Sequence, residues 1–99
     1  MAVTEVNGKK FIQVSMDASG GNWVMSREAV IRELRLTGIA EGDYMTFYEA
    51  AGGNPRVCRL DYYKPATMFQ GRLMTKLGFN WNECSVANPS AAILSIELE

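Results

Sequence analysis

The sequence predicts an α+β fold, in which two helices cover one face of an antiparallel or mixed sheet of four to six strands. Near both ends of the chain, apolar and polar residues alternate as they do in half-buried strands. Two inner segments, 27–36 and 65–77, instead carry apolar residues three and four positions apart, which is typical of amphipathic helices. The segments between them are rich in aromatic and β-branched residues, which favour strands.

The chain is expected to begin with a hairpin. Residues 3–6 and 11–16 flank Asn7-Gly8, a dipeptide that readily forms the tight turn of a two-stranded hairpin. The alternation in the second strand predicts one face toward the core, which consists of Ile12, Val14 and Met16.

A helix is predicted over residues 27–36. Ser26 can accept a hydrogen bond from a free amide of the first turn, and Gly38 is a natural stop. The predicted buried stripe of this helix consists of Val30, Ile31 and Leu34.

Segments 43–49 and 56–63 are predicted to form a second hairpin around the turn-rich segment 50–55. In the simplest register Phe47 faces Cys58, and Met45 faces Leu60, on the core side. The opposite face then carries Tyr44, Thr46, Tyr48, Val57, Arg59 and Asp61.

A second helix is predicted to begin at Pro65 or Thr67 and to end near Gly78. Strands follow over 80–86 and 92–98, and the last has the most regular alternation, with Ala92, Leu94, Ile96 and Leu98 on the core side. This order of elements indicates a ferredoxin-like arrangement. The additional hairpin at the start leaves a small barrel-like α+β fold as the alternative.

Length and composition indicate one domain spanning residues 1–99, since 99 residues supply a single hydrophobic core. The formal net charge of −1 disfavours a surface for nucleic-acid phosphates. The first ten residues lack the apolar core of a secretory signal, and no segment has the apolar length of a membrane span, so we expect a cytoplasmic protein without membrane contact.

The chain contains no histidine, which excludes Ser-His and Cys-His nucleophile pairs and histidine metal ligands. Cys58 and Cys84 are expected to be free thiols, with a disulfide between them as the minor alternative. Glu41 and Asp43 flank a glycine in a predicted turn, and no further metal ligands accompany them. We therefore predict no enzyme activity, no metal site and no cofactor.

The leading functional hypothesis is a noncatalytic protein-interaction module that forms a homodimer or belongs to a small assembly. Aromatic and arginine side chains are enriched at protein interfaces. The predicted interaction residues are Tyr44, Tyr48, Arg59, Tyr63, Trp23 and Trp81. Their partner is expected to be another protein or a second copy of the chain.

Two other classes of function remain open. One is a nucleic-acid-binding regulator or antitoxin-like protein, with candidate contacts Arg27, Arg32, Arg35 and Arg59. The other is a protein that binds a small ligand without transforming it.

Segment 21–34, followed by Gly38-Ile-Ala-Glu-Gly-Asp43 and the hairpin to Tyr63, resembles the strand, helix, Gly-Asp turn and hairpin of AbrB-type proteins. The resemblance covers less than half of the chain. This chain lacks the family's usual proline before the helix and has a longer connection after it. The resemblance implies a dimeric DNA-binding regulator or antitoxin.

Overall fold

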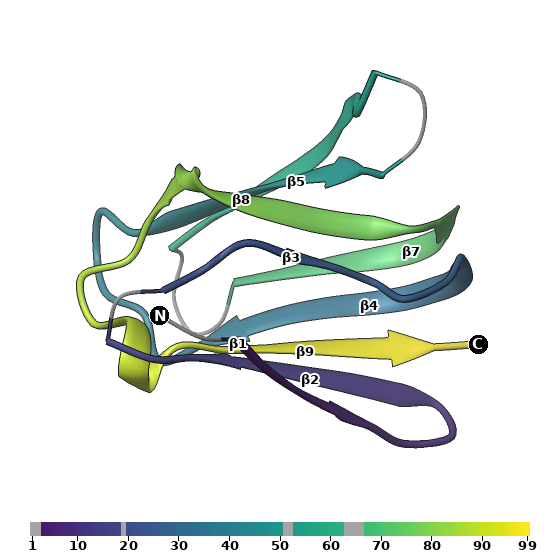
Figure 1. The fold of residues 1–99 in the computed structure, drawn as a ribbon, viewed down its shortest axis with the longest axis horizontal. Coiled ribbons are helices and arrows are strands. Elements are labelled where there is room, and N and C mark those ends of the chain that lie inside the picture. The colour runs from purple at the N-terminus through teal and green to yellow at the C-terminus, as the bar shows by residue number, and fades with distance from the viewer. Residues whose placement is uncertain (1–2, 19, 51–52, 63–66) are drawn as a thin grey trace.

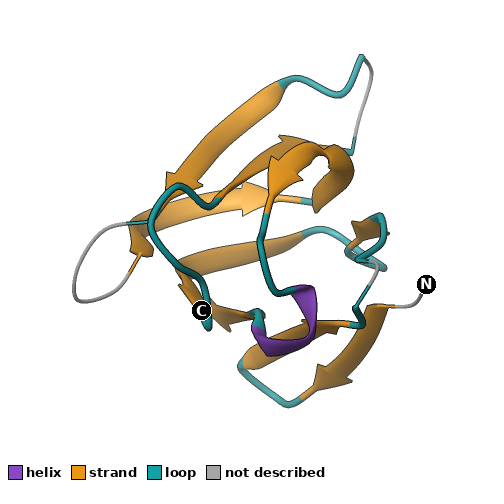
Figure 2. Cartoon of the chain, turned by 90° about the vertical axis from the view of Figure 1, so that its left-hand side faces the viewer, coloured by secondary structure: helices purple, strands orange, loops and turns teal. Residues whose placement is uncertain are grey.

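The computed structural model describes residues 3–18, 20–50, 53–62 and 67–99. In these segments the regular structure consists of nine β-strands and one short 3-10 turn, η1 (Pro89–Ala91), without an α-helix. Figure 2 shows the strands and the single helical turn. The predicted α+β class is therefore wrong, and with it both the ferredoxin-like arrangement and the barrel-like α+β alternative.

The strands form two antiparallel sheets. The five-stranded sheet has the order β1 (Val3–Asn7), β2 (Phe11–Met16), β9 (Ile93–Leu98), β4 (Ala29–Thr37) and β7 (Thr67–Thr75). The four-stranded sheet has the order β3 (Trp23–Val24), β8 (Leu77–Ser85), β5 (Tyr44–Glu49) and β6 (Arg56–Asp61). In Figure 1, β5 and β8 lie in the upper layer and β2, β4 and β9 in the lower one.

Successive strands repeatedly cross between the two sheets. When β2 to β9 are lettered B to I, the sheets have the orders B-I-D-G and C-H-E-F, which is the strand order of a jelly roll. β1 extends the first sheet beyond β2. Among the described residues, no helix is long and apolar enough to cross a membrane.

The predicted first helix is strand β4. Its pairing with both neighbouring strands shifts in register between Ile31 and Glu33. Against β9 the extra residue is on β4, which marks a β-bulge at Arg32, whereas against β7 the extra residue is on β7, between Gln70 and Leu73. Because the bulge adds a residue, Ile31 and Leu34 both point into the core although they are three positions apart. The strand, helix, turn and hairpin pattern implied by the resemblance to AbrB-type proteins is therefore absent here.

The predicted second helix is replaced by strands of two different sheets. Pro65 lies outside the described residues, Thr67 begins β7, and Lys76 separates β7 from β8. Leu73 and Leu77, four positions apart, belong to these two strands, so their spacing results from the chain crossing between sheets.

Several strand predictions are confirmed. The first hairpin forms, although its turn is Lys9-Lys10, closed by the hydrogen bond from Gly8 N to Phe11 O at 2.9 Å. In the middle hairpin Phe47 faces Cys58 and Met45 faces Leu60, as predicted. The last strand has the predicted inward face: Leu94 and Ile96 of β9 are fully buried, as is Ala92 just before the strand, and Leu98 is partly buried.

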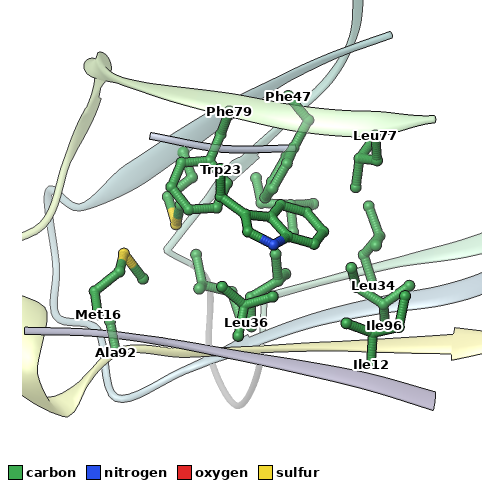
Figure 3. Close-up of a cluster of buried hydrophobic side chains, with 14 of the residues drawn as sticks. Ile12, Met16, Trp23, Leu34, Leu36, Phe47, Leu77, Phe79, Ala92 and Ile96 are labelled. Atoms are coloured by element: carbon green, nitrogen blue, oxygen red, sulfur yellow. The ribbon is translucent and has the colours of Figure 1, made fainter. Parts of the chain in front are cut away.

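The core lies between the two sheets. Figure 3 shows Phe47, Phe79 and Leu77 pointing from the four-stranded sheet toward Leu34 and Ile96 of the other sheet. Phe79 packs edge-on against Phe47, with ring centroids 6.0 Å apart. Burying large side chains of this kind contributes about 1.5–3 kcal/mol each to folding, and both sheets depend on it.

Candidate functional site

The predicted aromatic surface is on the outer face of the four-stranded sheet, where Tyr44 of β5 meets Arg59 of β6. The Arg59 guanidinium carbon lies 3.9 Å from the centre of the Tyr44 ring, which is a cation–π contact. Asp61 accepts hydrogen bonds from Nε and Nη2 of Arg59 at 3.0 and 2.9 Å. These hydrogen bonds raise the pKa of Arg59 above its usual value. The guanidinium of Arg59 therefore stacks on the tyrosine ring and is held at its edge by the carboxylate; we call such a group a stack.

A second stack of the same composition lies beside the first. The guanidinium carbon of Arg56 on β6 lies 5.8 Å from the centre of the Tyr48 ring. Glu83 of β8 accepts hydrogen bonds from Nε and Nη2 of Arg56 at 2.8 and 2.7 Å. The Tyr48 ring is buried above Gly78, where an added Cβ would lie 2.9 Å from the ring. We call the two stacks together the tyrosine–arginine face; its residues are Tyr44, Arg56, Arg59, Asp61 and Glu83, together with the buried Tyr48, whose ring contacts Arg56.

The sequence analysis placed four of these six residues on one face and missed Arg56 and Glu83. A register shift between Phe47 and Tyr48 places Arg56 opposite Tyr48, whereas uninterrupted pairing would have placed it opposite Glu49. Glu83 lies in the part of β8 where pairing with β5 is also shifted. Nothing in the sequence marks either irregularity.

The two tryptophans occupy different environments. Trp23 is buried in the core, 5.8 Å from the Phe79 ring, and its Nε1 donates to Glu5 Oε2 at 2.6 Å. It therefore lines no surface. Trp81 is half-buried, with its ring over Gly20. The remaining predicted interaction residue, Tyr63, lies outside the described residues.

The four arginines predicted for nucleic-acid contact do not gather on one surface. Arg59 lies on β6 of the four-stranded sheet, whereas Arg32 and Arg35 lie on β4 of the other sheet and Arg27 lies before that strand. Three of them form ion pairs: Arg32 with Glu99, Arg35 with Glu33, and Arg59 with Asp61. Nucleic-acid binding stays a prediction without a shared surface to support it.

The outer face of the five-stranded sheet is hollowed beside the bulge of β4. One open hollow of about 880 Å³ is lined in part by Arg32, Arg72 and Glu99. A neighbouring hollow of about 510 Å³ shares Glu33 and Glu97 with it. Both arginine and glutamate side chains line these hollows, and they form solvent-exposed ion pairs with one another. These observations do not test whether a small ligand binds there, so the small-ligand alternative stays a prediction.

The remaining candidate residues have structural roles. Asp43 is buried, and its carboxylate accepts hydrogen bonds from Ala40 N at 2.9 Å and Ala87 N at 3.2 Å. Cys58 on β6 and Cys84 on β8 are free, and β5 separates their strands. Burial raises the pKa of both thiols, that of Cys84 to about 11. Within the described residues, no group of three or more acidic or cysteine side chains could hold a metal ion.

Comparison of the chain with protein-family models, with curated proteins and with solved structures finds no match.

Proposed function

We propose that this protein is a noncatalytic interaction module that binds a protein partner through the tyrosine–arginine face. The observation that supports the proposal is the pair of adjacent stacks, each with a tyrosine, an arginine and a carboxylate. Tyrosine and arginine are the side chains that most often dominate binding energy at protein interfaces.

The carboxylates hold both arginines in place before binding. Asp61 and Glu83 each bind their arginine through two of its nitrogen atoms, so less side-chain freedom is lost when a partner docks. Exposed ion pairs contribute only about 0–1 kcal/mol to folding, so these contacts are not required for stability.

The chemistry of the face suggests the kind of surface that it binds. Two arginines balance two carboxylates, so a strongly charged partner gains little. The Arg59 side chain is 52% exposed and has the Tyr44 ring on one side. A planar group of the partner, such as an aromatic ring or a peptide bond, can stack on its other side.

The experiment is affinity capture with the immobilised chain from cells that express it, followed by titration of the purified partner. We expect Arg59→Ala and Tyr44→Ala each to weaken binding about 30-fold, which corresponds to about 2 kcal/mol at a hot spot. Arg27→Ala is the matched control and should leave the affinity within twofold, because Arg27 lies outside the face.

Equal effects of Arg27→Ala and Arg59→Ala would contradict the assignment of the face. Retention of DNA or RNA probes at low ionic strength, with loss as salt rises, would favour the nucleic-acid alternative.

A further inference from the structure

We infer that β1 is a self-association edge at which a second copy of this chain adds its own β1 in antiparallel orientation. This inference goes beyond the proposed partner site, because β1 lies at the edge of the other sheet.

Edge strands expose backbone groups that can pair with another chain, and proteins commonly block them with bulges, charges or short strands. Among the described strands, β7, β6, β3 and β1 are at edges. β7 and β6 have register shifts in their pairing, and β3 has two residues. β1 pairs with β2 without interruption from Val3 to Asn7, so its outer edge is regular.

Hydrogen bonding in the first hairpin determines which groups of β1 point outward. Gly8 N donates to Phe11 O, so Val6 and Thr4, two and four positions earlier, also bond to β2. The hydrogen bond from Leu98 N to Lys10 O is consistent with this assignment. It shows that the even-numbered positions bond to β9, which leaves the odd-numbered residues of β2 to bond to β1. The N–H and C=O groups of Val3, Glu5 and Asn7 are therefore directed toward the free edge.

This alternation restricts the registers of a symmetric pair. If Glu5 lay on the twofold axis, it would face Glu5 of the second copy, and like charges directly opposite are destabilising. With Val6 on the axis, each Glu5 faces Asn7 of the second copy, and both pairs exchange backbone hydrogen bonds.

The Val6-centred register also brings complementary side chains together. Val6 is 50% exposed and would contact Val6 of the second copy on the outer face. Within one chain, Asn7 Nδ2 already donates to Glu5 Oε1 at 2.8 Å, so this amide and carboxylate are a compatible pair across the axis as well. The contact involves a short strand, so we expect a weak dimer that forms with rising concentration.

Sedimentation equilibrium between about 10 μM and 1 mM tests the inference. The expected weight-average mass rises from 11.0 kDa toward twice that value. Val6→Lys should abolish the rise, because it places two cations opposite each other at an exposed position. Met74→Lys is the matched control, since Met74 is 62% exposed on β7.

A second variant removes only a backbone donor. Asn7→Pro deletes an N–H that points toward the free edge, so it should disrupt the dimer and leave the β1–β2 hairpin intact. Circular dichroism and melting temperature check that each variant remains folded.

A wild-type chain that stays at 11.0 kDa at the highest concentration would overturn the inference. So would a dimer that both Val6→Lys and Asn7→Pro leave intact. If the wild-type chain is monomeric and the Val6→Lys variant no longer captures the protein partner, the β1 edge binds that partner. This result would also overturn self-association. Arg59→Ala, which lies on the other sheet, should leave the dimer unchanged, so failure of the proposed function and failure of this inference are distinguishable.

Discussion

The buried carboxylate of Asp43 provides a quantitative test of the fold. It joins two loops, because its oxygens accept hydrogen bonds from Ala40 N at 2.9 Å and from Ala87 N at 3.2 Å. A hydrogen bond to a charged group contributes about 1.5–3 kcal/mol. Asp43→Ala removes both, and water can reach part of the freed sites because Ala40 and Ala87 are exposed, so we expect the free energy of unfolding to fall by about 3 kcal/mol.

Urea denaturation measures this loss from the shift in midpoint at constant slope. Asp43→Asn keeps one acceptor oxygen and should lose about half as much. Glu41→Ala is the control, since Glu41 is exposed two positions away and should change stability by less than about 0.5 kcal/mol. If Asp43→Ala and Glu41→Ala were equally stable, the bridging role of Asp43 would be refuted.

Three further predictions follow from local geometry. Gly38→Ala should lower the free energy of unfolding by about 3 kcal/mol or more, because Gly38 has a φ of 74° and an added Cβ would lie 1.8 Å from Ala91 O. A melting temperature equal to that of the wild type would contradict this prediction. Gly78→Ala should displace the Tyr48 ring, seen as a changed aromatic NMR shift; an unchanged shift would show that the ring does not cover the glycine. At pH 8 the Cys84 thiol should react slowly with iodoacetamide until the chain is unfolded, because burial raises its pKa to about 11; equal rates in both states would be inconsistent with that burial.

The raised thiol pKa also gives the sign of a pH dependence. The ordinary pKa of a cysteine thiol is 9.0, and burial raises the pKa of Cys84 to about 11 in the folded chain. The folded chain therefore holds this proton more tightly than the unfolded one. The contribution of Cys84 to stability is fully present below pH 9 and is lost as the pH rises toward 11.

Sequence patterns predicted the regular strands well and failed where strands are irregular. Alternation identified the core sides of β2 and β9, because uninterrupted strands repeat every two residues. In β5 it identified Met45 and Phe47 but not the burial of Tyr48, which follows a register shift. In β4 the bulge at Arg32 changes that repeat to a spacing of three between Ile31 and Leu34, which imitates a helix. The good helix formers around it, such as Glu28 and Arg32, add to the imitation, and tertiary pairing overrides their preference.

The candidate site was likewise predictable only where its strands pair regularly. Tyr44 and Arg59 were placed on one face because the register of β5 and β6 follows from the positions of Phe47 and Cys58. Trp23 was expected near the surface because polar residues surround it in the sequence, whereas the structure buries it between the sheets. Its partner in hydrogen bonding, Glu5, is eighteen positions away and no local pattern joins the two.

The two-sheet fold requires that residues 29–37 form a strand inside the five-stranded sheet, and interstrand nuclear Overhauser effects measure this directly. We expect backbone contacts from Leu34 to Ile96 on one side and from Ile31 to Leu73 on the other. Contacts between residues three positions apart along 27–36, without these cross-strand contacts, would show a helix and contradict the account.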